Sequence, residues 1–423
     1  MEDSVYTPGA GHSPPVLAGR DELLRNWSLT LNDVISRGRV RADDLILVGP
    51  RGVGKTVTVT AFAQLAREQG FEVVNLQPAG GRSSLVGSLL HRARDGIAAE
   101  AGPWQRARQA FERLAGVSFT VAGFGAGVSM RAEDQPETDG GDLAIALATL
   151  AEEVRRDQPR GGVLVTIDEI QGAAHSDLVL FAAALHRLNV DHKDAPVTFA
   201  GTGLPNTAVA LRKAGVTHPD RLFDLQTIPL TLDPEDARFA IVEPARAVGV
   251  TWDPEAATAI ARASNGYPAH LQLFADAAWT AAKGPDQITT ADIKLALPRA
   301  TAEIERRSLG PRWDRMTGRQ MELLAALALH NGRATTATLA HTLGRPRSAL
   351  SWIRDELLEE GDVYVPRYGE LAMAVPLFGH YIVERYEHAR DEHTQPLLRL
   401  EDMRANTAAA AKKSANESGA RPA

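Results

Sequence analysis

Short apolar runs alternate with longer helical patterns along the first half of the chain. The apolar runs predict strands at residues 44–48, 71–76, 163–169, 197–203 and 225–230. Between them, apolar residues recur at the i, i+3, i+4 spacing of helices, as at Val59, Phe62, Ala63 and Ala66. Strands that alternate with helices are typical of an α/β fold with a parallel sheet. We therefore predict an α/β core over residues 16–232.

The pattern changes after residue 232. Residues 233–312 have helical periodicity with no strand signal, which predicts a helical subdomain. Residues 313–392 then read as helix, helix, helix and hairpin, the order of a winged helix-turn-helix domain. The two ends, 1–15 and 393–423, are polar or rich in alanine, and we expect both to be largely disordered.

An insertion interrupts the core at about residues 80–141. Within it, apolar residues alternate along 117–130 and change phase at Gly123, which predicts a hairpin. Two interpretations are open: the hairpin meets a neighbouring molecule, or it packs on its own domain as isolated hairpins require.

Composition narrows the classes of protein. The 423 residues include no cysteine, which excludes disulfides and thiolate metal sites and agrees with a reducing cytosol. No apolar stretch has the length of a signal peptide or membrane span, so we expect a cytoplasmic protein without a membrane partner. The net charge of −7 argues against non-specific coating of nucleic acid.

The strongest motif follows the first predicted strand and matches the phosphate-loop pattern G-x-x-x-x-G-K-[ST]. It consists of Gly49, Pro50, Arg51, Gly52, Val53, Gly54, Lys55 and Thr56. Its glycines let backbone N–H groups surround a polyphosphate, Lys55 reaches the β and γ phosphates, and the Thr56 hydroxyl ligates Mg²⁺. The predicted helix after it adds a positive end to the anion site. The context predicts binding of ATP with Mg²⁺.

Two further strands end in polar side chains. The strand at 163–169 ends in Asp168 and Glu169. Running beside the first strand, it would bring Asp168 to the Mg²⁺ and Glu169 to the attacking water. The strand at 197–203 carries Thr202, which is either placed to sense the γ phosphate or closes a strand at a glycine turn.

Together these residues resemble P-loop ATPases of the AAA+ superfamily, near the origin-recognition type initiators and the STAND signalling ATPases. The resemblance covers about residues 16–390 and rests on the phosphate loop, on Asp168 and Glu169, and on Gly266-Tyr267-Pro268. It implies a P-loop NTPase sheet, an α-helical lid over 233–312 and a winged helix.

The resemblance also implies roles for further residues. Gly19 and Arg20 would lie by the adenine, and Thr202 would occupy the sensor position, where initiators usually have asparagine. Arg221 would be an arginine finger that reaches a neighbour's γ phosphate, which requires a homo-oligomer. The alternative is a surface arginine that pairs with Asp220 or Asp224.

The lid departs from the initiators. It has Gly266-Tyr267-Pro268 where they normally place an arginine that senses nucleotide, and Pro268 would contact the nucleotide instead. We therefore expect a slow ATPase that works as a switch.

The predicted winged helix leaves its partner open. Its DNA-binding candidates are Arg345, Arg347, Ser348, Arg354 and Arg367. Residues 312–390 contain ten arginines and ten acidic residues, however, and a dedicated DNA-binding domain is normally more basic. We predict an ATP-dependent switch whose winged helix binds double-stranded DNA. The alternative is a STAND-like regulatory scaffold whose winged helix binds a partner protein.

Overall fold

The structure is a computed structural model that describes residues 3–9, 11–41, 44–78, 84–99, 102–115, 140–282, 286–392 and 396–419. The chain forms two compact units. We call Arg20–Gly49 with Lys55–Ile228 the sheet unit, and Met1–Gly19 with Pro50–Gly54 and Pro229–Ala423 the helical unit. Residues 50–54 of the phosphate loop thus group with the helical unit.

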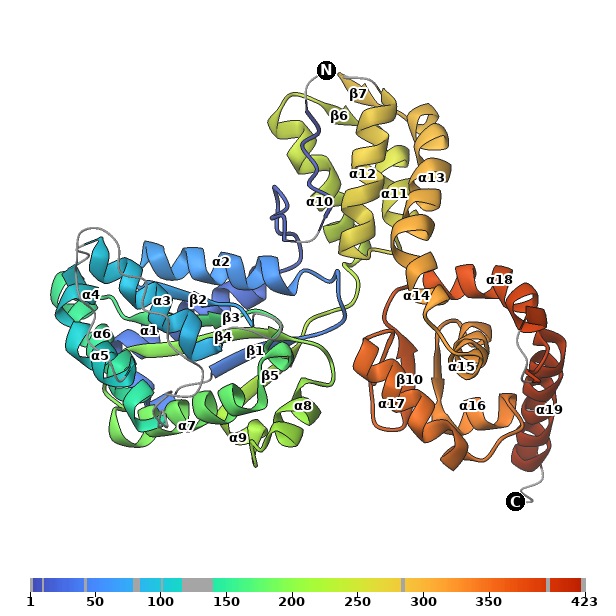
Figure 1. The fold of residues 1–423 in the computed structure, drawn as a ribbon. Coiled ribbons are helices and arrows are strands. Elements are labelled where there is room, and N and C mark those ends of the chain that lie inside the picture. Colours follow the sequence, from blue (N-terminus) through green and yellow to red (C-terminus); the bar gives the residue numbers. More distant parts are fainter. Residues whose placement is uncertain are drawn as a thin grey trace. The chain divides into compact units, whose positions relative to one another are not determined.

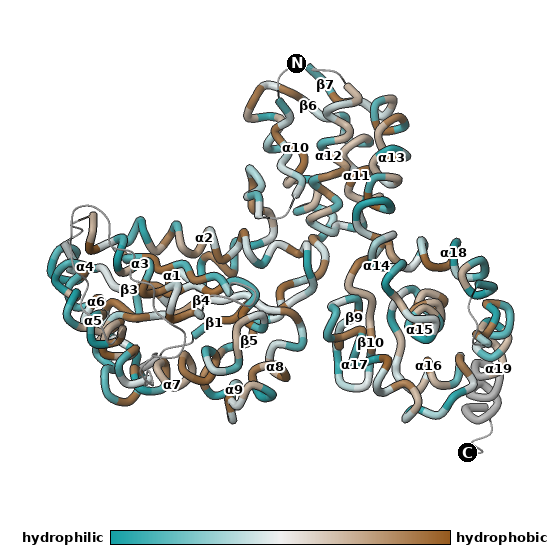
Figure 2. The backbone as a smooth tube through the Cα atoms, viewed as in Figure 1, coloured by the Kyte–Doolittle hydropathy of each residue, from teal (hydrophilic) through white to brown (hydrophobic). Residues whose placement is uncertain are grey.

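The sheet unit is built on five parallel strands in the order β2-β3-β4-β1-β5. Their bounds are Asp44–Val48 (β1), Glu72–Leu76 (β2), Val163–Ile167 (β3), Val197–Gly203 (β4) and Phe223–Thr227 (β5). The predicted α/β fold is confirmed, and the predicted boundaries differ most at β5. Parallel sheets are covered on both faces, so their central strands are buried and mostly apolar. Figure 2 shows this hydrophobic colouring along β3, whose five residues are all buried.

Helices cover both faces of this sheet (Figure 1). Side chains alternate along β1: Leu45 and Leu47 pack with the first two helices, whereas Ile46 and Val48 face the opposite layer. The helices of the sheet unit are α1 (Asp21–Arg37), α2 (Lys55–Glu68), α3 (Leu85–Ala98), α4 (Gly102–Arg106), α5 (Arg108–Ala115), α6 (Gly140–Asp157), α7 (His175–Asp191), α8 (Thr207–Ala214) and α9 (Pro219–Leu222). The predicted hairpin at 117–130 lies outside the described residues.

The helical unit begins with a helical bundle. Its elements are α10 (Pro234–Ala247), β6 (Thr251–Trp252), α11 (Pro254–Ala263), α12 (Pro268–Ala282), β7 (Gln287–Ile288), α13 (Thr290–Ile304) and α14 (Gly310–Asp314). The expectation that no strand interrupts this region is wrong, because β6 and β7 pair in parallel. Each is two residues long, too short to show an alternating pattern.

Helices and a small sheet follow in the C-terminal part of this unit. They are α15 (Gly318–Leu329), β8 (Arg333–Thr335), α16 (Thr336–Thr342), α17 (Ser351–Glu360), β9 (Val363–Tyr364), β10 (Glu370–Met373), α18 (Phe378–Glu392) and α19 (Leu400–Gly419). The three strands form an antiparallel sheet in the order β8-β10-β9.

Described residues near both ends of the chain lie in ordered contacts. Tyr6 is buried, its hydroxyl donates to the Ile241 carbonyl at 2.6 Å, and it accepts from Nε1 of Trp252 at 2.8 Å. The tail forms α19, in which Leu400 and Met403 are buried. Tyr6 thus has buried partners for its hydroxyl, and the alanine run in the tail favours helix. No helix of the described residues is long and apolar enough to cross a membrane.

Candidate functional site

The phosphate loop joins β1 to α2, as its motif predicts. Gly52 and Gly54 have φ angles of 84° and 92°, a region that side chains with a Cβ rarely adopt. The N–H of Gly49 donates to the Gly203 carbonyl at 3.2 Å, which ties the loop's first residue to the end of β4. Helix α2 begins at Lys55, so its N-terminal N–H groups border the loop.

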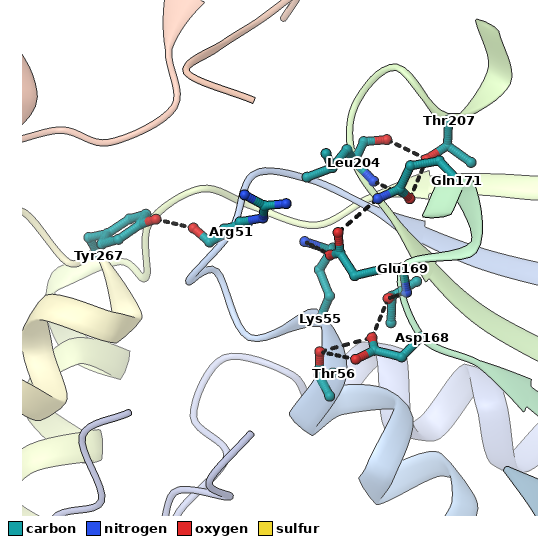
Figure 3. Close-up of polar contacts among 10 residues, drawn as sticks. Arg51, Lys55, Thr56, Asp168, Glu169, Gln171, Leu204, Thr207 and Tyr267 are labelled. Atoms are coloured by element: carbon teal, nitrogen blue, oxygen red, sulfur yellow. Dashed lines mark hydrogen bonds and ion pairs between the residues drawn. The ribbon is translucent and has the colours of Figure 1, made fainter. Parts of the chain in front are cut away.

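Asp168 lies where the loop's hydroxyl can reach it (Figure 3). Oγ1 of Thr56 donates to the Asp168 carboxylate at 3.0 Å, and Oγ1 of Thr202 donates to the same carboxylate at 2.5 Å. The expectation that the carboxylate strand runs beside the first strand is wrong, because β4 lies between β3 and β1. That arrangement is what brings Thr202 into the site.

Thr56 and Asp168 fit a magnesium ion. Mg²⁺ takes oxygen ligands and is usually bound by one or two carboxylates together with substrate phosphates and water. The hydroxyl of Thr56 and the carboxylate of Asp168 converge from α2 and from the end of β3, within hydrogen-bond distance of each other. Among the described residues, no group of three or more acidic or histidine side chains forms a metal cage.

Glu169 follows Asp168 in a left-handed backbone conformation, with φ of 49°. Its backbone N–H donates to Oγ1 of Thr202 at 2.8 Å. Its carboxylate is held on both sides: Oε1 lies 3.4 Å from Nζ of Lys55, and Oε2 accepts from Nε2 of Gln171 at 2.7 Å. Lys55 is 4% exposed and Glu169 one-third exposed, so their ion pair is partly shielded from water.

Gln171 is a site residue that the sequence patterns did not single out. It sits in the 3-10 turn Ile170–Gly172, directly after the two carboxylates. The sequence places an amide side chain two residues after Glu169. A glutamine at a turn is common, however, so this position alone does not predict a role in the site. Only the folded chain shows it between Glu169 and the N–H of Leu204, which donates to Oε1 of Gln171 at 3.1 Å.

The Gly266-Tyr267-Pro268 segment contacts the loop residues that group with the helical unit. The Tyr267 hydroxyl donates to the Arg51 carbonyl, and the N–H of Ala269 donates to the Gly52 carbonyl at 3.1 Å. Burial raises the pKa of Tyr267 to about 12, so its hydroxyl keeps the proton that it donates. A Cβ at Gly52 would meet the Tyr267 hydroxyl at 2.7 Å. Pro268 is the first residue of α12 and is half-buried.

The remaining candidates for nucleotide contact lie at two places. Gly19 has a φ of 66°, and a Cβ on it would approach the Asp236 carboxylate at 2.6 Å. Arg20 is buried at the start of α1. Arg221 is exposed on α9, and the described residues show no ion pair between it and Asp220 or Asp224. The pairing alternative for Arg221 therefore gains no support.

The candidate DNA contacts divide into two groups. Arg345 pairs with the buried Glu322 at 2.9 Å, and Arg354 pairs with its neighbour Asp355 at 2.9 Å. Arg347, Ser348 and Arg367 are exposed.

Comparison with known proteins agrees with the site. Residues 16–198 match the AAA ATPase domain family, which confirms the resemblance to AAA+ ATPases for this part of the chain. Residues 306–382 match a domain family of unknown function. No curated protein matches the chain by sequence.

Solved structures share the fold, among them a Walker-type ATPase and an ORC2 protein. The Walker-type ATPase of Pyrococcus abyssi is similar with a TM-score of 0.56 and 16% identity, over 86% of this chain and 96% of that one. The ORC2 protein of Aeropyrum pernix, solved in ADPNP and ADP complexes, is similar with a TM-score of 0.54 and 13% identity, over 90% and 96% of the two chains. At these identities the similarity shows the P-loop NTPase fold.

Proposed function

We propose that this protein is a cytoplasmic AAA+ ATPase that binds ATP with Mg²⁺, hydrolyses it slowly and works as a molecular switch. The observation that carries the proposal is the position of Asp168 and Glu169 against the phosphate loop. The hydroxyl of Thr56 bonds to one carboxylate, and the ammonium group of Lys55 pairs with the other. The match of residues 16–198 to the AAA ATPase domain family supports it.

Each side chain has a task in this reaction. Lys55 places a positive charge beside the β and γ phosphates, while Thr56 and Asp168 hold the magnesium that spreads the phosphate charge. Glu169 orients and polarises the attacking water. Thr202 holds both acids, since it bonds to the carboxylate of Asp168 and to the backbone of Glu169.

Slow turnover follows from the contacts that Glu169 already has. Both of its carboxylate oxygens are engaged, one by Lys55 and one by Gln171. The Lys55 pair must separate before Glu169 can accept a hydrogen bond from water. The Gly266-Tyr267-Pro268 segment supplies a proline and a tyrosine at a place where initiators carry a charged arginine, so it offers no charge to the transition state.

Phosphate release tests this proposal. Wild type, Lys55→Ala and Glu169→Gln are compared at saturating ATP and Mg²⁺, with binding of a fluorescent ATP analogue measured in parallel. We expect Lys55→Ala to lose binding and Glu169→Gln to keep binding while turnover falls by about a hundredfold. Equal phosphate release from all three proteins would overturn the enzymatic proposal.

We also propose that residues 313–392 form a winged-helix domain that binds double-stranded DNA. The order of α15, β8, α16, α17, β9 and β10 supports this, because α17 would be the recognition helix and the β9–β10 turn the wing. The exposed Arg347 and Ser348 stand just before α17, and the exposed Arg367 stands in the turn. These three side chains are suited to phosphate contact.

A second candidate partner is a protein, and one observation favours it. The exposed side chains of α17 include Trp352, Asp355, Glu356, Glu359 and Glu360. Four carboxylates along the proposed recognition helix repel a phosphate backbone, whereas an aromatic residue among polar ones is typical of protein interfaces. This candidate is a STAND-like regulatory scaffold.

Binding to duplex DNA at increasing salt separates the two candidates. Wild type and the double variant Arg347→Ala/Arg367→Ala are measured with ADP and with a non-hydrolysable ATP analogue. If the domain binds DNA, the double variant binds more weakly and its affinity depends less steeply on salt. No retention of wild type at low salt excludes the DNA partner and leaves the protein partner.

Arg221 is proposed as an arginine finger that acts in a homo-oligomer. Its exposed position on α9, next to β5, leaves its side chain accessible to a second subunit. The size of the protein is measured with ADP and with the ATP analogue, alongside turnover of Arg221→Ala. Unchanged turnover and size in this variant would remove the assignment.

A further inference from the structure

The geometry points to Gln171 as the positioning residue that fixes the carboxylate of Glu169, an inference that rests on the proposed ATPase function. Nε2 of Gln171 donates to Oε2 of Glu169 at 2.7 Å. Among the described residues, Lys55 and Gln171 are the side chains that contact the Glu169 carboxylate. Figure 3 shows Gln171 on the side of Glu169 that faces Leu204 and Thr207.

The orientation of the Gln171 amide is determined by its second partner. The backbone N–H of Leu204 is a donor only, so the atom that it meets at 3.1 Å must be the amide oxygen. The NH₂ group therefore faces Glu169. Leu204 is buried, and a buried N–H without a partner is costly, which holds the amide in this orientation.

Leu204, which holds the Gln171 amide, is itself held in place by a second hydrogen bond. Oγ1 of Thr207, a fully buried residue at the start of α8, donates to the Leu204 carbonyl at 2.6 Å. The segment after β4 is thus held at Leu204, and it holds Gln171 in turn. Thr202 near the end of β4 accepts from the backbone N–H of Glu169. The end of β4 and the residue after it therefore hold the backbone of Glu169 and, through Gln171, its carboxylate.

In this arrangement the two carboxylate oxygens of Glu169 have different roles in the reaction. When Lys55 moves to the phosphates, Oε1 loses its partner while Oε2 stays bonded to Gln171. Oε1 then accepts a hydrogen bond from the water. The water oxygen bonds to the γ phosphorus as the bond from that phosphorus to the ADP oxygen breaks, and the released proton passes to Oε1. Without Gln171 the carboxylate rotates freely, and a small loss of alignment lowers the rate strongly.

Gln171→Glu separates positioning from a structural role. The substitution keeps the side-chain length and the oxygen that accepts from Leu204, but it removes the donor to Glu169 and adds a like charge beside it. Gln171→Met, which removes the bonds to Glu169, Leu204 and Thr207 without adding charge, is the second variant. Gln64→Glu is the matched control, because Nε2 of the exposed Gln64 donates to Glu68 at 3.0 Å on the surface of α2.

We expect Gln171→Glu to lower kcat by about ten- to a hundredfold, with Kd for a fluorescent ADP and the melting temperature close to wild type. Gln171→Met lowers kcat as well and also lowers the melting temperature, because the Leu204 N–H loses its partner. Gln64→Glu leaves kcat unchanged.

Two outcomes overturn the inference. Wild-type kcat in Gln171→Glu, or in a folded Gln171→Met should the first variant not fold, shows that Gln171 only supports the Leu204 segment. Absence of phosphate release from the wild type overturns the proposed ATPase function, and the role of Gln171 with it.

Discussion

The hydroxyl of Thr202 joins the two acids of the site, because it donates to the carboxylate of Asp168 and accepts from the backbone N–H of Glu169 at 2.8 Å. Thr202 is fully buried, so both bonds are shielded from water. A single hydroxyl thus holds the carboxylate of Asp168 and the backbone of Glu169.

Replacement of Thr202 by valine removes this hydroxyl and keeps the shape of the side chain. We expect kcat to fall by about tenfold or more, and the free energy of unfolding to fall by about 1–3 kcal/mol because the Glu169 N–H is left without a partner. The Mg²⁺ concentration for half-maximal turnover should rise as Asp168 loses its support. Thr202→Ser, which keeps a hydroxyl, is the control, and a valine variant with wild-type kcat would contradict the assignment.

The buried N-terminal Tyr6 gives a prediction about stability. Tyr6→Phe deletes the hydroxyl that bonds to the Ile241 carbonyl and to Nε1 of Trp252. We expect the free energy of unfolding to fall by about 1–3 kcal/mol, because two buried polar groups lose their partner. Tyr368→Phe is the matched control, since Tyr368 is fully exposed. Equal denaturant midpoints for the two variants would show that the Tyr6 hydroxyl adds no stability.

Asp362 connects two segments of the helical unit. This buried carboxylate, 1% exposed, pairs with Arg312 at 2.7 Å and with Arg315 at 2.6 Å. Removal of one member of a buried ion pair costs about 3–5 kcal/mol, and we expect Asp362→Ala to approach the lower value because Arg315 is partly in water.

Chemical denaturation measures this loss against an exposed pair. Asp355→Ala breaks the bond to Arg354 on the surface of α17, where we expect a cost below about 1 kcal/mol. If Asp362→Ala is no more destabilising than Asp355→Ala, burial of the Asp362 cluster has been misjudged.

His270 predicts how stability depends on pH. Burial lowers the pKa of His270 to about 4, and the charge of Arg312 acts in the same direction. The unfolded chain binds a proton near pH 6.5, whereas the folded chain does so only near pH 4. The contribution of His270 to stability is therefore complete above pH 6.5 and declines as the pH falls toward 4, by up to about 3 kcal/mol in total.

Unfolding at a series of pH values checks this dependence. His270→Gln should lower the slope of the unfolding free energy against pH between pH 6.5 and 4, because about one proton fewer is taken up on unfolding. His341→Gln, at an exposed position on α16, should leave this slope unchanged. Identical slopes for wild type and His270→Gln would show that folding does not change the pKa of His270.

The amino-acid sequence determined the parts of the site that are contiguous. The phosphate loop needs glycines at Gly52 and Gly54 because of their positive φ angles, and it sits between an apolar strand and a helix, so a local pattern is enough to predict it. The same holds for Asp168 and Glu169 at the end of a strand. Apolar runs likewise predicted the strands of the sheet, with small errors at their ends.

The tertiary structure decided which distant residues meet. Strand order placed β4 between β1 and β3, which no local pattern encodes, and so brought Thr202 to Asp168. Gln171 gained a role only because the chain after β4 offers it the N–H of Leu204. Arg345, which the sequence alone suggests as a DNA contact, pairs with the distant Glu322 once the helices pack. Hydrogen bonds and ion pairs depend on distances of a few ångströms, and only the packed chain sets those distances.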